Sequence, residues 1–83
     1  MYYVYVIQNS RGKIYIGQTN NLEKRLNQHN DKNFSKKSYT KIQKGPWKLI
    51  YKEKYLTRQE AEKRERELKS HKGRDWLREH MGP

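Results

Sequence analysis

The sequence predicts an α+β fold in which a small three-stranded antiparallel sheet is flanked by helices. Two patterns lead to this prediction. Strand-like runs rich in Tyr, Val and Ile occupy residues 2–8, 13–19 and 47–55, and amphipathic helical runs follow the second and third of them. The chain has 83 residues, so we expect a single domain over 1–83, with a small core that removes about 60–65% of the unfolded surface from water.

The first two strands are expected to pair as a hairpin. Asn9 suits the first position of a type I turn, and Gly12 suits the left-handed position that follows it. In this hairpin Asn9 faces Lys13, so Tyr5 faces Gly17, where the missing side chain leaves open space. Because side chains alternate between the two faces of a strand, one face carries Tyr3, Tyr5, Ile7, Tyr15 and Gly17, and the other carries Val4, Val6, Ile14 and Ile16.

The remaining elements follow in order. Asn20 or Asn21 can cap a helix with Leu22, Leu26 and His29 on one face, Arg25 at its edge and Asn30 at its end. The basic segment 31–46 holds either a short helix around 36–43 or a loop. In the third strand Trp47, Leu49, Tyr51 and Tyr55 alternate with lysines. Thr57 and Glu60 form a capping box for a helix that runs to about His71, Gly73 ends it, and 75–80 can form a last short helix.

The charge of the chain indicates a polyanionic partner. Twenty Lys and Arg against nine Asp and Glu give a net charge of +11, which favours contact with nucleic acid. A basic domain that is associated with ribosomes, or merely soluble, is the alternative. The chain contains no cysteine, which excludes disulfides, thiolate metal sites and thiol nucleophiles and fits a cytoplasmic location. No apolar run approaches the roughly 20 residues that span a membrane.

The second helix places a carboxylate on its apolar stripe. Ala61, Glu65 and Leu68 follow each other at helical spacing, so Glu65 is expected to point inward. A buried carboxylate needs a partner, and an ion pair with Arg25 or a lysine competes with a metal for this role. A single carboxylate completed by water and substrate phosphate suits Mg²⁺. A two-metal nuclease is not favoured, because the first fifty residues contain only Glu23 and Asp31 as acids.

Arg25 and His29 lie four residues apart and therefore share a helix face near the tyrosines. An arginine fork in this place is suited to clamp a phosphate. Each residue also has a plain structural interpretation, since His29 can cap or pack and a Tyr-rich strand can simply be half-buried. Together they offer a candidate base, a phosphate clamp and a metal ligand.

These residues resemble a known family. Tyr3-Val4-Tyr5, then Tyr15-Ile16-Gly17, then Arg25 and His29 on the next helix are similar to the GIY-YIG nuclease domain, and the helix from Ala61 to Lys69 resembles that family's metal-binding helix. The likeness is to small stand-alone bacterial members related to the UvrC N-terminal endonuclease domain. It implies an endonuclease that hydrolyses nucleic-acid phosphodiesters, with DNA as the expected substrate and Mg²⁺ or Mn²⁺ as cofactor, in DNA repair or recombination.

The resemblance also implies roles for single residues. Tyr15 would act as general base or position the water, with support from Tyr5, while Arg25 stabilises the pentavalent phosphate and His29 assists proton transfer. Glu65 would be the single metal ligand. A phenol needs a nearby cation to lower its pKa, and Arg25 and Lys13 are the candidates. Residues expected to bind substrate are Lys13, Gly17, Gln18, Lys36 and Lys37.

The chain departs from the family in three ways. Gln18 stands where several relatives carry a Lys, no Asn follows the metal helix, and no separate DNA-targeting domain is attached. A protein partner is therefore expected to supply target specificity. Two alternatives to the nuclease remain open: a non-catalytic nucleic-acid-binding module on the same fold, and a protein-interaction or RNA-associated domain that uses the basic segment 32–48.

Overall fold

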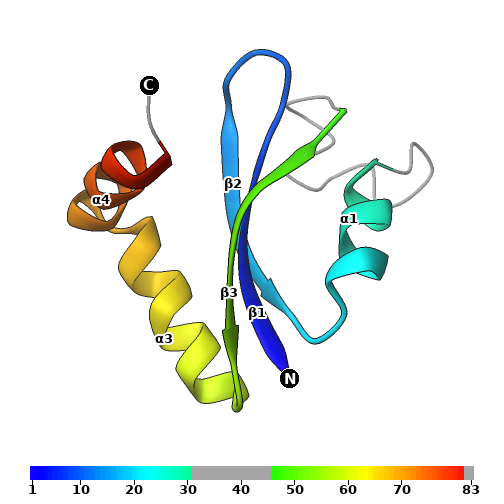
Figure 1. Ribbon diagram of the computed structural model, residues 1–83, viewed down its shortest axis with the longest axis vertical. Helices are drawn as coiled ribbons and strands as arrows, with labels where there is room; N and C mark the ends of the chain where they lie inside the picture. Colours follow the sequence, from blue (N-terminus) through cyan, green and yellow to red (C-terminus); the bar gives the residue numbers. More distant parts are fainter. Residues whose placement is uncertain (31–45, 82–83) are drawn as a thin grey trace.

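The computed structural model describes residues 1–30 and 46–81 (Figure 1). The elements are β1 (Tyr2–Gln8), β2 (Ile14–Thr19), α1 (Leu22–Asn30), β3 (Lys48–Tyr55), α3 (Arg58–Lys69) and α4 (His71–Met81). The expected α+β fold with a three-stranded antiparallel sheet is confirmed. The short helix expected around 36–43 lies outside the described residues.

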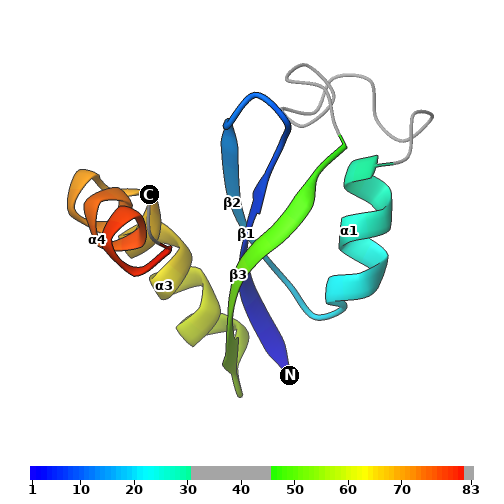
Figure 2. The same cartoon turned by 45° about the horizontal axis from the view of Figure 1, so that its top comes forward.

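The sheet separates two hydrophobic clusters. Its strand order is β2-β1-β3, and α1 covers one face while α3 and α4 cover the other (Figures 1 and 2). On the α1 side Tyr5, Ile7 and Trp47 are buried, with Leu22 and Leu26 of the helix packed against them. The cluster on the other side consists of Val4, Val6, Ile16, Ala61, Leu68 and Leu77.

The β1–β2 hairpin has the register expected from its turn. The Asn9 N–H donates to the Lys13 carbonyl at 3.0 Å, and the Gly12 N–H donates to the Asn9 carbonyl at 3.1 Å. Gly12 has a φ of 82°, the left-handed conformation that glycine adopts without steric cost. Tyr5 therefore pairs with Gly17, and Ile7 pairs with Tyr15, which brings Tyr5 and Tyr15 to the α1 face.

Strand β3 does not alternate regularly along its length. Val6 pairs with Tyr51 but Ile7 pairs with Leu49, so Ile50 is an extra residue at a β-bulge. The bulge puts Leu49 on the α1 side together with Trp47, whereas Tyr51 and Tyr55 lie on the α3 side. The sequence predicted a strand in which Trp47, Leu49, Tyr51 and Tyr55 alternate with lysines. The strand is present, but the bulge breaks this alternation, because an inserted residue inverts the pattern beyond it.

An ion pair fixes α3 against β3. Arg64 donates two hydrogen bonds to the Glu53 carboxylate, from Nε at 2.8 Å and from Nη2 at 3.1 Å. The hydroxyls of Tyr51 and Tyr55 donate to the same carboxylate. The Arg64 guanidinium also lies over the Trp76 ring of α4, 4.8 Å from its centroid. This cluster sets the position of α3, the helix that carries Glu65.

The helix ends follow local chemistry, with one correction. Asn21 caps α1, since its Oδ1 accepts from the Lys24 N–H at 3.1 Å, and Thr57 caps α3 by accepting from the Glu60 N–H at 3.2 Å. Gly73, expected to end a helix, lies inside α4, and the chain turns instead at Ser70. A glycine is needed inside α4 for a steric reason, because a Cβ at position 73 would come 1.9 Å from the Glu67 carbonyl oxygen. Within the described ranges, no helix is long and apolar enough to cross a bilayer.

Candidate active site

Three aromatic rings from three elements meet on the α1 face of the sheet. The Tyr5 side chain of β1 is only 2% exposed, and its hydroxyl lies 2.8 Å from Nε2 of His29 on α1. The centroid of the His29 ring is 5.0 Å from that of Tyr15 on β2, and the Tyr5 and Tyr15 centroids are 6.3 Å apart. The hairpin register and the face of α1 thus bring together three of the predicted site residues.

Gly17 makes room for one of these rings. A Cβ at this position would lie 2.7 Å from the Tyr5 hydroxyl oxygen and 3.0 Å from Cε2 of Tyr15. Such distances are shorter than van der Waals contact, so any side chain here would displace Tyr5. The sequence predicted open space at Gly17, and this was wrong, because the Tyr5 ring fills it.

The environment of Tyr5 decides its protonation state. Burial raises the pKa of Tyr5 well above its ordinary value of 10.0, neighbouring Tyr15 and Glu65 add to the rise, and Arg25 opposes it. Tyr5 therefore keeps its proton at neutral pH. It can donate to Nε2 of a neutral His29 but cannot itself act as a phenolate base. The cation that acts on this phenol is Arg25, from the neighbouring helix.

Arg25 has donors left for a ligand. The residue is half-buried on α1, and its Nη1 donates to Oε1 of Gln28 at 3.4 Å. A guanidinium has five N–H donors in a planar fork, and this one acts electrostatically on the buried Tyr5. A phosphate placed above the tyrosine face would meet this positive charge.

Glu65 lies at the border between exposed and buried surface. Its side chain is 22% exposed, and its Oε2 lies 2.7 Å from Nζ of Lys69, one turn along α3. The alternative of an ion pair is thus found, with Lys69 as the partner. The carboxylate still contributes to the raised pKa of Tyr5, so it lies within electrostatic reach of the tyrosine site, although α3 packs on the other face of the sheet.

The residues present fit a single-carboxylate site for a hard cation. No group of three or more His, Cys, Asp or Glu in the described part of the chain could hold a metal. Glu65 can offer one or two oxygens, and Mg²⁺ commonly takes one or two carboxylates and completes its shell with water and substrate phosphates. The Lys69 ammonium lies 2.7 Å from this carboxylate, so a metal ion would have to displace it.

Two of the predicted substrate residues, Gln18 and Lys13, do not join this cluster. Gln18 pairs with Val4, so it belongs to the face that α3 covers rather than to the tyrosine face. Lys13 is exposed in the hairpin turn, where its N–H donates to Oδ1 of Asn9 at 2.9 Å. Lys36 and Lys37 lie outside the described residues.

Asn30 helps to hold α1 beside the sheet, whereas the sequence indicated only that it ends the helix. Its Nδ2 donates to the Trp47 carbonyl at 3.1 Å, and its Oδ1 accepts from the Trp47 N–H at 2.7 Å. This reciprocal pair joins the end of α1 to the start of β3, next to His29 in sequence. In the sequence, the only sign of this role is that Asn30 directly follows His29. The role itself could not be predicted, because the partner of Asn30 lies 17 residues away.

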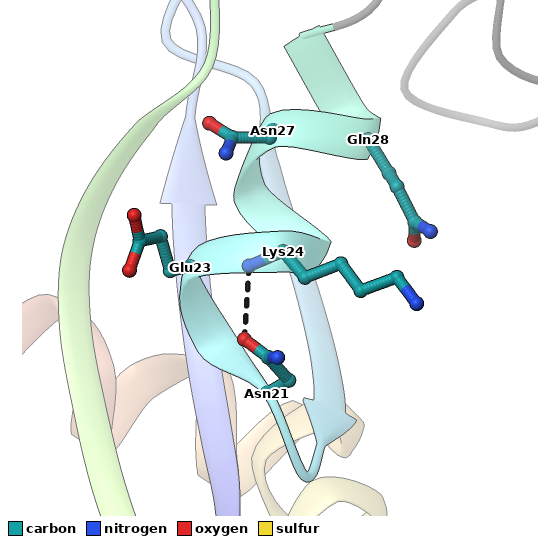
Figure 3. A pocket seen from close by; sticks show the side chains of 5 residues that line it. All are labelled: Asn21, Glu23, Lys24, Asn27 and Gln28. Carbon is teal, nitrogen blue, oxygen red and sulfur yellow. Dashed lines mark hydrogen bonds between the residues drawn. The ribbon is translucent and has the colours of Figure 1, made fainter.

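A hollow on the exposed side of α1 is not part of this site (Figure 3). Its lining combines one acid and one base with three amides, from Asn21, Glu23, Lys24, Asn27 and Gln28. The dashed contact in Figure 3 is the helix cap, from the Lys24 N–H to Asn21. It contains none of the aromatic residues described above.

Comparison with known proteins identifies the family. The model of the GIY-YIG catalytic domain matches residues 1–79. The chain belongs to the GIY-YIG family. A UPF0213 protein of Staphylococcus saprophyticus is 39% identical over 69 residues, which covers 83% of this chain and 80% of that protein. A UPF0213 protein of Staphylococcus aureus is 36% identical over 77 residues, with 93% and 90% covered.

A solved structure supports the same assignment. The solution NMR structure of a UPF0213 protein from Bacillus halodurans matches with a TM-score of 0.58 and 26% identity, over 100% of this chain and 89% of that one. The resemblance to the GIY-YIG family and its fold is therefore confirmed. The finer likeness to the UvrC N-terminal domain stays a prediction, since the relatives found are UPF0213 proteins.

Proposed function

We propose that this GIY-YIG protein is an endonuclease that hydrolyses phosphodiester bonds, with DNA as the substrate and one divalent metal. The observation that supports it most is the convergence on Tyr5: its hydroxyl contacts His29, its ring lies next to Tyr15, and the charges of Arg25 and Glu65 both act on it. We assign to these residues the roles of base, phosphate clamp and metal ligand, which is the set of groups that phosphodiester hydrolysis needs.

The residues divide the work as follows. Tyr5 keeps its proton and holds His29 through the 2.8 Å contact. Tyr15, which is partly exposed, orients the attacking water and, as a phenolate, would take the proton that the water loses. His29 assists from beside it, with its ring centroid 5.0 Å from that of Tyr15. Arg25 neutralises charge on the phosphate as the bond to the leaving oxygen breaks.

Glu65 would hold Mg²⁺ or Mn²⁺, which supplies positive charge to the leaving oxygen when it is bound.

The substrate follows from charge rather than from the site. A net charge of +11 on 83 residues favours nucleic acid in the cytoplasm, and Lys13, Gln18, Lys36 and Lys37 are the further residues that we assign to its binding. A role in DNA repair or recombination, related to that of UvrC-like nucleases, follows the family resemblance. In this proposal residues 1–83 form a single domain, and a partner protein chooses the site of cleavage.

The test is cleavage of labelled nicked, branched, flapped and single-stranded DNA, with one RNA, in Mg²⁺ or Mn²⁺. We expect metal-dependent products from the wild type and none from Glu65→Ala. The control is Glu62→Ala, one turn earlier on α3 and absent from the charges that act on Tyr5, which should cut like the wild type. Equal products from all three proteins would contradict the proposal.

One observation favours a second function. Glu65 is already paired with Lys69, which suits a non-catalytic module that keeps the fold and binds nucleic acid through its charge. That module would show tight, salt-sensitive binding with wild type and Glu65→Ala alike, and no product in any metal.

A further inference from the structure

A separate hollow lies at the outer edge of β2. It has a volume of about 300 Å³ and is lined by Ile14, Tyr15, Ile16, Lys69 and Arg74. Only Tyr15 belongs to the site proposed above. Two cations from two different helices therefore converge on one concave place beside a site tyrosine, and no carboxylate is among the residues that line it.

The joint between α3 and α4 builds this pair of cations. The chain turns at Ser70, whose carbonyl accepts from the Arg74 N–H at 3.0 Å. Gly73 lets the first turn of α4 approach the end of α3, where any Cβ would collide with the Glu67 carbonyl. As a result Arg74 donates from Nε to the Lys69 carbonyl at 3.3 Å, and the two basic side chains share one hollow.

The edge strand adds backbone donors. In an antiparallel ladder, hydrogen-bonded pairs alternate with non-hydrogen-bonded ones. The Asn9 N–H bonds to the Lys13 carbonyl, so Ile7–Tyr15 and Tyr5–Gly17 are the next bonded pairs in this register. The N–H and C=O groups of Ile14 and Ile16 therefore both point away from β1, toward the outer edge of β2, and both residues line the hollow. Only the N–H groups can bind a phosphate oxygen, so the charge of Lys69 and Arg74 has to favour the anion over the neighbouring carbonyls.

The side chains of Lys69 and Arg74 are both accessible to a ligand. The Lys69 side chain is 44% exposed, and its partner is Glu65 on the same surface. Arg74 is also exposed, and its recorded side-chain contact uses only Nε. Two cations and two outward amides provide what a phosphate oxygen requires: positive charge and N–H donors.

We propose that this hollow binds a backbone phosphate of the nucleic acid, one neighbouring the phosphate that is cleaved beside Tyr15. Lys69 and Arg74 supply the charge, and the amides of Ile14 and Ile16 supply the direction. The proposal rests on the proposed function, because Tyr15 is the residue that the two places share. It extends the site around the edge of β2 to the joint between α3 and α4.

The test is an amide NMR titration of ¹⁵N-labelled protein with a short DNA duplex in EDTA. We expect the Ile14 and Ile16 amide signals to shift with the wild type and to stay in place with the double variant Lys69→Ala/Arg74→Ala. Lys63→Ala, an exposed lysine on α3 outside the hollow, is the matched control and should behave like the wild type. Unchanged signals of buried Val4 and Leu68 would show that each variant is folded.

The salt dependence of binding gives a second readout. Loss of phosphate contacts lowers the slope of log K against log [salt] by about one for each contact, so we expect a drop of about one to two in the double variant. A wild type without shifts at Ile14 and Ile16, or shifts that persist in the double variant, would overturn the proposal. So would an equal drop in slope with Lys63→Ala. Because EDTA removes divalent metal, these outcomes are independent of whether the protein cuts DNA.

Discussion

The substitution Gly17→Ala tests how tightly the tyrosine site is packed. The added methyl would lie 2.7 Å from the Tyr5 hydroxyl oxygen and 2.8 Å from Cζ. Tyr5 is 2% exposed and its hydroxyl contacts His29 at 2.8 Å, so the ring cannot move without loss of that contact. We expect the variant to fold with a displaced Tyr5.

The expected cost follows from two opposing effects. Overpacking of a full core costs about 1–3 kcal/mol, and Ala in place of Gly in a strand returns about 0.5–1 kcal/mol. The mid-range values leave a net loss of about 1 kcal/mol, which should lower the Tm by about 4–8 °C in a domain of this size. Urea and thermal unfolding followed by circular dichroism would measure both quantities.

A double-mutant cycle with Tyr5→Phe locates the strain. Loss of the hydroxyl removes the nearest contact to the new methyl, so Gly17→Ala should cost less in the Tyr5→Phe background, by about 0.5–1 kcal/mol. Gly12→Ala is the control. Its cost comes from the positive φ, its nearest neighbour is Gln8 at 4.0 Å, and it should show no coupling to Tyr5→Phe. Additive costs for positions 5 and 17, or a Gly17→Ala protein as stable as the wild type, would refute the packing argument.

Three further predictions concern the groups around this site. Tyr5 has a raised pKa in the folded protein, so its contribution to stability is complete below pH 10. The contribution is lost above pH 10, where Tyr5 ionises in the unfolded chain but not in the folded one. The free energy of unfolding in urea should therefore decline between pH 9 and 11, and this decline should be shallower in Tyr5→Phe by up to about 1.4 kcal/mol per pH unit. Asn30→Ala breaks both bonds to the buried Trp47 backbone and should cost about 2–4 kcal/mol, whereas exposed Asn27→Ala should cost less than about 0.5 kcal/mol; equal costs in urea unfolding would speak against the role of Asn30. Lys69→Ala frees the Glu65 carboxylate and should strengthen Mn²⁺ binding to the DNA-free protein several-fold in a paramagnetic titration. The control Lys63→Ala should leave Mn²⁺ binding unchanged. Weaker Mn²⁺ binding in Lys69→Ala would argue against Glu65 as the metal ligand.

Local chemistry made much of the fold predictable from sequence. The Asn9–Gly12 turn set the register of the hairpin, and that register alone placed Tyr5 opposite Gly17 and Tyr15 on the same face. The caps at Asn21 and Thr57 also depend on residues within three positions. These features need no knowledge of the rest of the chain.

The features that sequence did not show depend on contacts between distant segments. The bulge at Ile50 arises where β3 meets β1, and the helical place of Gly73 arises from its contact with the Glu67 carbonyl. A glycine in a strand, such as Gly17, indicates open space beside it, but here the ring of Tyr5 fills that space. The partner of Glu65 stayed open for the same reason, since Arg25, a lysine and a metal all satisfy one carboxylate on a helical stripe.

In the proposed function, Glu65 and the tyrosine face form one metal-dependent site. Single-turnover cleavage at saturating protein, with DNA binding measured in the same samples, tests it most directly in Glu65→Gln, which removes the charge and keeps the shape. We expect Glu65→Gln to bind DNA as tightly as the wild type and to lose at least about a hundredfold in the Mg²⁺-dependent rate, roughly the size of effect that loss of one stabilising electrostatic group has. A Glu65→Gln protein that cuts at the wild-type rate would contradict it.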